Sequence, residues 1–503
     1  QIAVELSNEI EAAYLPPIFN LFGREWIPGI DLDPHINIVH LASLNSEELG
    51  FFDSSDEYPT SVFAESNQHE AVYINMADLT PGDEFYFGTV VHEIQHLIQW
   101  NNDKNEETWL DEGLSQLAEV YSGLDSFEVI DYLNYHDIQL NTWSYDSTDV
   151  YSHYSGSALF MIYFYEQLGA AAVTDLAQNR LDGMAAIADV VERRSNLTFE
   201  AFLSNWFVAL HLNGTSVDAR YNYDYAFTPI EVDYRVSSNQ LAEQNSLHQF
   251  SSRYIALDGG KIHHLSFAGD TLHELAPIPP YAEHAAGSLV WYAPPANKLN
   301  SKLVTEIDLT GIADLTLTYD IWFEFENNYD FLYVMVSADG GNSWETLNTR
   351  YSTNSLYGPG ITGRSADQGA QNQGWVTDSI SLDRYRNQVV QLKFEVVTDS
   401  TNADGGVAID NIQIGNEYFN DLESGGEGWA SDGFVHVRQA LPQSWSVQLI
   451  RYGETITVES LPLDELNQGR WILNLSDPAT IVIAPITPFT QALGSYWLYI
   501  DSR

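Results

Sequence analysis

The stretch VVHEIQHLIQWNNDKNEETWLDEGLSQLAE, residues 90–119, decides how the first part of the chain is interpreted. Apolar residues recur at helical spacing on both sides of a short polar turn, which predicts helices over 87–100 and 108–121. His92 and His96 are four residues apart, so they lie on one face of the first helix, one turn apart. The polar turn is short enough for the second helix to fold back against the first.

Two imidazoles one turn apart can bind the same cation, and Glu93 beside them can reach a water on that cation. A catalytic zinc takes three protein ligands and keeps one position open. A third histidine in the form HExxHxxGxxH is excluded, because Gln99 occupies the glycine position. We predict Glu112 as third ligand, with 15 residues between it and His96, and Glu119 on the same helix face is the alternative. The competing interpretation is a chance HExxH beside a solvated acidic face.

Composition describes a chain of several domains. Its 503 residues exceed one core, and a hydrophobic content of 44% suits packed domains. The balance of 20 Lys and Arg against 71 Asp and Glu, a formal charge of -51, leaves no basic surface for nucleic acid. Cysteine is absent, and no stretch of about 20 apolar residues could span a membrane. Because the chain begins at Gln1 rather than Met, we expect that any signal peptide has been removed.

The pattern changes near residue 225, from helical periodicity upstream to short strands and turns downstream. In the first part we predict a helix that Pro16 and Pro17 kink or break, two strands and a further buried helix, over 3–22, 36–41, 70–75 and 157–168. In the second part the clearest prediction is a hairpin of strands 331–337 and 344–347. A proline-containing stretch, 276–287, is expected to be a linker or long loop.

HEIQH followed by WLDEG resembles the gluzincin clan of zinc metallopeptidases, and most of all the hyicolysin-like bacterial group, whose HExxH precedes a W-x-x-E-G-L-x-x-x-A-E helix. The similarity covers roughly residues 15–210, including PGIDLDPHINIVHL and SNQHEAVYIN. It implies a Zn²⁺ cofactor held by the two histidines and Glu112, with Glu93 as general base. Gln116 stands where thermolysin-like members have Asp, and the gap before Glu112 is shorter than in the best-known members. Both departures leave the partners of the ligand histidines open.

The resemblance also implies a donor that stabilises the oxyanion of the transition state. The run VYSHYSGSALFMIYFYEQLG is similar to a segment in which a tyrosine precedes a G-x-A-L helix, so Tyr154 is the predicted donor. His153 and Tyr151 are alternatives, and an ordinary core tyrosine is the structural interpretation.

In the same clan, an edge strand upstream of the HExxH helix pairs with the substrate backbone. The strand predicted over 70–75 therefore implies substrate binding by Tyr73, Ile74 and Asn75. The alternative is an interior strand that never meets substrate. The Gly-x-Met-Glu-Asn signature of aminopeptidases is absent, which favours an endopeptidase.

The run EIDLTGIADLTLTYDIWFEFENNYDFLYVMVSADGGNSW, followed by DGGVAIDNIQI and GWASDGF, resembles the jelly-roll module of immune inhibitor A-type peptidases, which is similar to MAM domains. Such modules often hold Ca²⁺ through acidic loops, and hairpin acids that face water are the alternative. The calcium candidates are Glu324, Glu326, Asp330, Asp404 and Asp410. Cell-surface or glycan contact is a further expected role of the β domains.

These observations together predict an α+β zincin-type catalytic domain followed by all-β domains of jelly-roll or β-sandwich type. The expected domains are 1–225, the gluzincin metallopeptidase domain, 226–284, a β-rich connector, 285–439, a MAM-like jelly roll, and 440–503, a small β domain. We predict a bacterial secreted or cell-surface zinc endopeptidase that acts on proteins or peptides. The alternatives are a zinc aminopeptidase and a non-catalytic adhesin or carbohydrate-binding protein, although an intact Glu93 argues against the latter.

Overall fold

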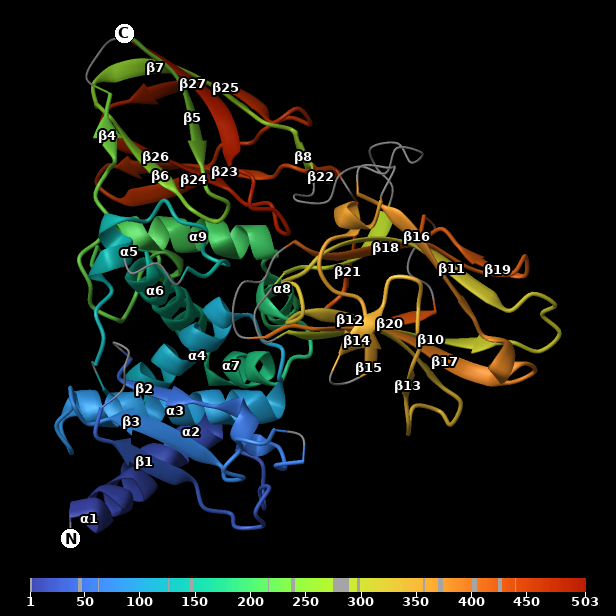
Figure 1. Ribbon diagram of the computed structural model, residues 1–503. Coiled ribbons are helices and arrows are strands. Elements are labelled where there is room, and N and C mark those ends of the chain that lie inside the picture. Colours follow the sequence, from blue (N-terminus) through green and yellow to red (C-terminus); the bar gives the residue numbers. More distant parts are fainter. Residues whose placement is uncertain are drawn as a thin grey trace. The chain divides into compact units, whose positions relative to one another are not determined.

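The computed structural model describes residues 2–503 apart from 44–47, 62, 125, 145–148, 216, 237–239, 275–288, 296–298, 356–357, 370–373, 400–404, 424–427 and 439. It divides into two compact units. The first comprises Gln1–Gly269, Trp445–Ile486 and Leu493–Arg503, and the second comprises Asp270–Ser444 and Thr487–Ala492 (Figure 1). The linker expected over 276–287 lies outside the described residues. Within the part of the chain that is described, no helix has both the length and the apolar character that a membrane crossing requires.

The first unit begins with one helical run, in which α1 (Ile2–Glu9), a π-helical turn (Ile10–Tyr14) and α2 (Leu15–Phe22) follow each other directly. The helical run is not broken at Pro16 and Pro17, and a kink there stays a prediction. Both prolines lie in the first turn of α2, directly after the wider π turn, in which the Leu15 amide donates to the Ile10 carbonyl.

A small sheet follows, made of β1 (Asn37–Leu41), β2 (Gly50–Phe52) and β3 (Ala71–Asn75) in the order β1-β3-β2. β1 runs parallel to β3 and β2 runs antiparallel to it. β3 is therefore the central strand, and β2 is an outer strand.

This order corrects the prediction that substrate pairs with Tyr73, Ile74 and Asn75. All three residues pair with β1 on one side. On the other side, Tyr73 and Ile74 pair with β2, and the Asn75 N–H donates to the Leu49 carbonyl (2.8 Å). No backbone edge of β3 is left for a peptide, so the interior-strand interpretation holds.

The helices of the first unit surround one apolar core, to which α3, α4 and α6 contribute most of their buried side chains. α4 matches its predicted bounds, and Gly123 follows it with the positive φ expected of a helix-ending glycine. The bounds are α3 Glu84–Asn102, α4 Thr108–Tyr121, α5 Ile130–Asn134, α6 Val150–Leu168, α7 Ala170–Ala177, α8 Gly183–Arg194 and α9 Phe199–Leu212.

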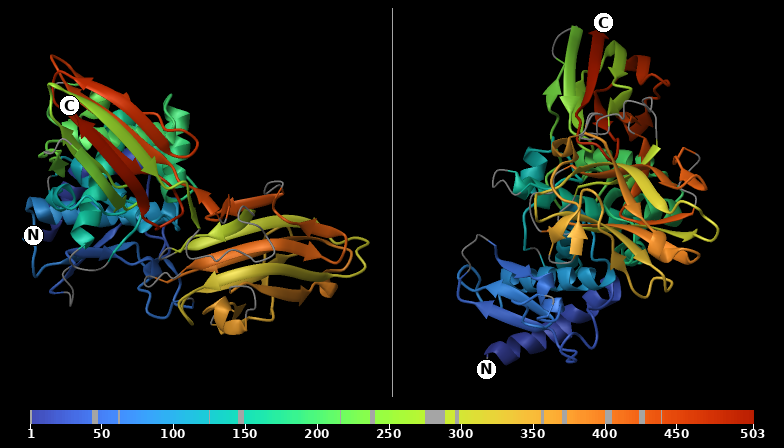
Figure 2. Two further views of the ribbon diagram at one scale, coloured as in Figure 1. Left: turned by 90° about the horizontal axis from the view of Figure 1, so that it is seen from above. Right: turned by 45° about the vertical axis from the view of Figure 1, so that its right-hand side comes forward.

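A β-sandwich completes the first unit, and its strands come from two distant parts of the chain. Its sheets have the orders β24-β23-β26-β6-β4 and β25-β7-β27-β5, so each sheet joins early and late strands, which appear as green and red arrows in Figure 2. The strands are β4 Tyr234–Arg235, β5 Gln240–Leu247, β6 Arg253–Leu257, β7 Lys261–Gly269, β23 Trp445–Tyr452, β24 Ile456–Ser460, β25 Gln468–Leu475, β26 Ala479–Pro485 and β27 Gly494–Ser502. The segments 226–284 and 440–503 thus do not fold as the two separate domains that the sequence predicts, because β6 pairs with β26 and β7 pairs with β27 in the same sheets.

The sandwich is attached to α9 by buried hydrogen bonds. The hydroxyls of Ser204 and Ser446 lie 2.7 Å apart, and the Tyr254 hydroxyl donates to the carbonyl of Phe207 (2.7 Å). Tyr254 also belongs to the core cluster of the helices. One face of the sandwich therefore packs into the helical core, while its two sheets enclose a second cluster of their own.

The second unit is a two-sheet sandwich with its own core. The sheet orders are β13-β12-β17-β10-β20 and β16-β11-β18-β9-β21. The predicted hairpin is confirmed, because Met335 pairs with Thr346. The strands are β8 Leu272–Glu274, β9 Leu289–Ala293, β10 Asn300–Asp308, β11 Thr316–Glu324, β12 Phe331–Ser337, β13 Glu345–Thr346, β14 Thr353–Ser355, β15 Gly358–Gly360, β16 Val376–Ser381, β17 Val389–Val397, β18 Gly406–Ile414, β19 Tyr418–Asn420, β20 Trp429–Asp432, β21 Val435–Arg438 and β22 Ala440–Pro442.

Candidate metal centre

α3 and α4 pack against each other and carry the predicted site. α3 begins after Asp83, whose carboxylate accepts a hydrogen bond from the Tyr86 amide (2.8 Å), as an N-cap residue should. The rings of His92 and His96 follow on one face, with centroids 4.8 Å apart. The helical spacing read from the sequence therefore brings the two imidazoles together.

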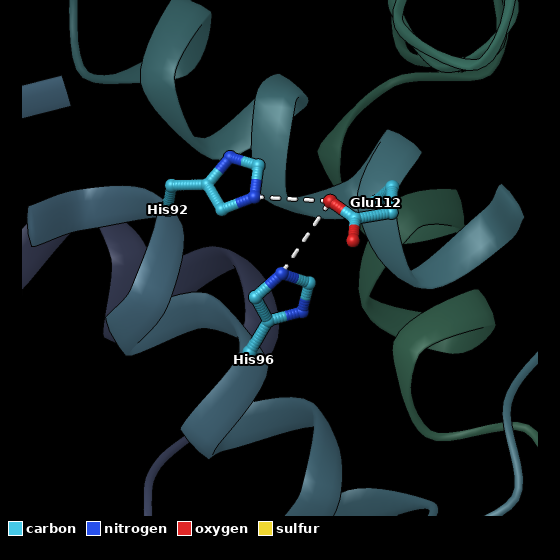
Figure 3. A group of neighbouring side chains, drawn as sticks. All are labelled: His92, His96 and Glu112. Atoms are coloured by element: carbon cyan, nitrogen blue, oxygen red, sulfur yellow. Dashed lines mark hydrogen bonds and ion pairs between the residues drawn. The ribbon is translucent and has the colours of Figure 1, made fainter. Parts of the chain in front are cut away.

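Glu112 of α4 points between the two rings (Figure 3). Its Oε2 lies 3.1 Å from His92 Nε2 and 3.5 Å from His96 Nε2. The ligand atoms of His92, His96 and Glu112 all lie within 4.8 Å of one another. Among the described residues, no other three His, Cys, Asp or Glu side chains come this close together. Two imidazole nitrogens and one carboxylate are the donor set that a catalytic zinc takes in His₂Glu sites.

The Nδ1 atom of each histidine also lies within hydrogen-bond distance of a carboxylate oxygen. His92 Nδ1 lies 2.9 Å from Glu119 Oε1, and His96 Nδ1 lies 3.0 Å from Asp111 Oδ2. Such hydrogen bonds fix the ring orientation and leave both Nε2 atoms for a metal. Glu119, the alternative third ligand, thus contacts the outer side of His92. Asp111 and Glu119 supply the partners that the departure at Gln116 left open.

Glu119 is itself held in place by Ser126, which follows α4, and it packs beside Gly88 of α3. The Ser126 hydroxyl donates a hydrogen bond to Glu119 Oε2. A Cβ added to Gly88, one turn before His92, would lie 2.9 Å from Glu119 Oε2 and 2.1 Å from Ser126 Oγ. Only glycine leaves room for this carboxylate beside the helix.

The electrostatics of the cluster favour added positive charge. Burial lowers the pKa of His92, but hydrogen bonds to Glu112 and Glu119 outweigh burial and raise the pKa to about 10. Burial likewise opposes ionisation of Glu112, yet the two histidines bring its pKa well below the usual value. The carboxylates therefore stabilise cationic charge at the Nε2 atoms, which is where a zinc dication would supply it. The residues present fit the metal.

Glu93, the predicted general base, lies on α3 with 6% of its surface exposed. Burial raises the pKa of its carboxyl group, and the neighbouring histidines lower it. A Cβ added to Gly50 of β2 would lie 3.0 Å from Glu93 Cγ and 2.7 Å from Thr89 Cγ2. The outer strand β2 therefore lies directly against the helix face that carries Glu93.

Tyr154 lies in the first turns of α6 and makes an edge contact with Trp143, with ring centroids 4.7 Å apart. α6 packs on α4 next to Glu112, where a Cβ on Gly113 would lie 2.8 Å from Met161 Cγ. Positions 154, 157 and 161 share one helix face, so Tyr154 lies on the side of α6 that meets α4. Of its alternatives, His153 is buried and Tyr151 is exposed. The oxyanion role stays a prediction.

The calcium candidates of the second unit do not gather at one point. Glu324 forms an ion pair with Arg364 (2.9 Å), and Asp410 lies on β18 opposite Asp320. Asp330 accepts hydrogen bonds from the amides of Glu326 and Asp399 at 3.3 and 3.0 Å. Asp404 lies outside the described residues. Calcium binding in the second unit stays a prediction.

The sequence interpretation missed the roles of Asp111, Ser115 and Glu119. Ser115 Oγ lies 3.2 Å from His96 Nδ1 and donates to Gln95 Oε1 (2.6 Å). A signal for Glu119 existed, because it follows Glu112 by seven residues and so shares its helix face. That signal was interpreted only as a second candidate ligand.

Comparisons with known proteins relate part of the chain to peptidases. Residues 281–438 match the family model described as Immune inhibitor A-like, MAM domain. The chain is 25% identical over 156 residues to Pre-pro-metalloprotease PrtV of two Vibrio cholerae strains, which covers 30% of this chain and 16% of the relative. It is 24% identical over 120 residues to Bacillopeptidase F of Bacillus subtilis, which covers 24% of this chain and 7% of the relative. The matches thus span about a sixth or less of those relatives.

Proposed function

We propose that the chain is a zinc-dependent endopeptidase that hydrolyses peptide bonds of protein substrates outside a bacterial cell. One observation carries the proposal. His92, His96 and Glu112 converge from two packed helices, and the two histidines are oriented by separate carboxylates. The similarity of part of the chain to a protein named as a metalloprotease supports it.

When bound, zinc supplies Lewis-acid polarisation of a water and of the scissile carbonyl. His92, His96 and Glu112 would hold it. Glu93 accepts the proton of the attacking water and returns it to the leaving amine. Its burial suits this role, because a carboxyl group with a raised pKa can carry the proton between the two steps. Tyr154 donates a hydrogen bond to the oxygen that becomes charged.

The substrate backbone pairs with β2 rather than with β3. β2 is an outer strand of its sheet, and Gly50 lies against Thr89 and Glu93. A peptide added beside β2 as a further strand would run past the general base. Main-chain pairing of this kind does not require a free terminus, which is consistent with an endopeptidase.

The test compares wild type with Glu93→Gln, which keeps size and polarity but cannot take up the proton. Zinc content and secondary structure should be unchanged, and casein hydrolysis should fall by at least about 10²-fold. Glu84→Gln, an exposed substitution in the first turn of the same helix, is the matched control and should hydrolyse casein like wild type. Near-wild-type hydrolysis by zinc-loaded Glu93→Gln would refute the mechanism. Absence of zinc-dependent hydrolysis in wild type would favour the non-catalytic surface protein.

A further inference from the structure

The first unit contains a second group of acidic side chains, none of which is a ligand of the candidate zinc site. Glu25 follows α2, Glu57 ends the short 3-10 helix Ser54–Glu57, and Glu70 directly precedes β3. Their exposed fractions are 5%, 4% and 2%. Three glutamates from separate parts of the chain are thus almost wholly removed from solvent.

Their carboxylate oxygens lack hydrogen-bond donors. None of the described residues donates to Glu25 Oε2, to Glu70 Oε2 or to either oxygen of Glu57. By contrast, Glu70 Oε1 accepts from the Ile30 amide (2.7 Å). A buried oxygen without a donor or a cation costs stability, and here four such oxygens occur in three neighbouring side chains.

Two of these groups face each other. The carboxyl groups of Glu57 and Glu70 are in contact, and burial together with Glu70 raises the pKa of Glu57 to about 8. The charges of Lys104 and Arg24 lower the pKa of Glu57 and of Glu25, respectively, but burial has the larger effect at both carboxyl groups. Two buried carboxylates in contact need a cation or a shared proton between them.

The backbone also closes around Glu70. A Cβ added to Gly29 would lie 2.1 Å from Glu70 Oε2 and 2.4 Å from Oε1, and Gly29 has a φ of +83°. The loop that carries Gly29 and Ile30 therefore encloses this carboxylate. The enclosure and the hydrogen bond from the Ile30 amide together restrict the conformations open to the Glu70 carboxylate.

We propose that Glu57 and Glu70 bind a calcium ion directly, with Glu25 completing the site. The donors are all oxygen atoms, which selects a hard cation over zinc. Calcium takes six to eight oxygens in flexible geometry, so waters and backbone carbonyls fill the remaining positions. The three carboxylates are not all within 4.8 Å of one another, so a water molecule or a side-chain rotation would complete the coordination.

The position of the ion links it to the proposed substrate strand. The 3-10 helix ending at Glu57 directly follows β2, and Phe52 at the end of β2 pairs with Val72 near the start of β3. An ion between Glu57 and Glu70 would therefore hold the end of β2 against the start of β3. Calcium would stabilise the outer strand without touching the zinc site.

The experiment measures calcium binding and thermal stability of the full chain, and it does not use peptidase activity. Protein is dialysed into calcium-free buffer that contains zinc, so that the zinc site stays filled, and calcium is then added to about 1 mM. We expect a rise in Tm of about 3–6 °C, as for a site with a Kd of about 10⁻⁵ M. Glu57→Gln should bind one calcium fewer by isothermal titration and lose this rise. This variant removes an uncompensated charge, so it should fold.

Asp330→Asn is the matched control for calcium bound in the second unit, and it should keep the rise that depends on Glu57. The proposal is overturned if Glu57→Gln and Glu70→Gln bind as many calcium ions as wild type with the same change in Tm. It is also overturned if calcium leaves the Tm of wild type unchanged while Tm rises as the pH falls from 8 to 6. That result would show a shared proton between Glu57 and Glu70.

Discussion

Replacing Glu119 by glutamine tests whether this side chain orients a ligand or is itself a ligand. In the structure its Oε1 lies 2.9 Å from His92 Nδ1. Glutamine keeps an oxygen acceptor but removes the charge. A hydrogen bond to a charged group contributes about 1.5–3 kcal/mol and a neutral one about 0.5–1.5 kcal/mol, so the loss is about 1 kcal/mol. This corresponds to about a five-fold weaker zinc affinity.

Glu119→Ala removes the acceptor altogether, and zinc should then bind about 10–100-fold more weakly, as for other partners of ligand histidines. The assay is competition with a chromophoric chelator at one fixed pH, because zinc affinity depends on the protonation of its ligands. Glu192→Gln, an exposed substitution on α8, controls for the change in net charge and should bind zinc like wild type. Complete loss of zinc in Glu119→Gln would identify Glu119 as a ligand, and unchanged affinity in both Glu119 variants would refute the orienting role.

Three further outcomes are expected. Gly50→Ala forces a methyl group to within 2.7 Å of Thr89 Cγ2, so kcat/KM on a peptide substrate should fall about 10- to 100-fold with zinc retained. Gly453→Ala is the control, because no atom lies closer than 3.7 Å to the added methyl group. Equal kcat/KM values for Gly50→Ala and wild type would exclude β2 from the site. Burial raises the pKa of Glu107 to about 7, above the value of about 4.3 in the unfolded chain, so its contribution to stability is lost as the pH rises from about 4.3 through 7. Glu107→Gln should flatten the dependence of Tm on pH over this range, and an unchanged slope would contradict the assignment. Replacing 270–444 by a short glycine-serine loop should leave the zinc content and the helical circular dichroism of the first unit intact. The reason is that the two residues flanking this segment are in contact, since a Cβ on Gly269 would lie 2.4 Å from Trp445 Nε1. An unfolded product would contradict the division into units.

The parts of the structure that depend on local pattern could be predicted from the sequence. The histidines at i and i+4 and the apolar stripes of α3 and α4 fix which faces meet, so the convergence of His92, His96 and Glu112 followed from spacing. The hairpin of β12 and β13 followed from the turn glycines, Gly340 and Gly341, which both have positive φ.

The remaining features depend on contacts between distant residues. β2 has only three residues, too few for an alternating pattern, so the sequence predicts β3 as the substrate strand. The sandwich pairs strands from before and after the second unit, and periodicity carries no information on such pairing. The partners of His92 and His96 depend on side-chain conformations across two helices, which spacing alone does not determine.

The most direct test of the central claim is a crystal structure of the zinc-loaded protein with anomalous diffraction measured at the zinc absorption edge. The account predicts one strong anomalous peak about 2.0–2.2 Å from His92 Nε2, His96 Nε2 and a carboxylate oxygen of Glu112, with Glu119 on His92 Nδ1. A peak bound by Glu119 in place of Glu112, or no peak between the two histidines, would contradict it.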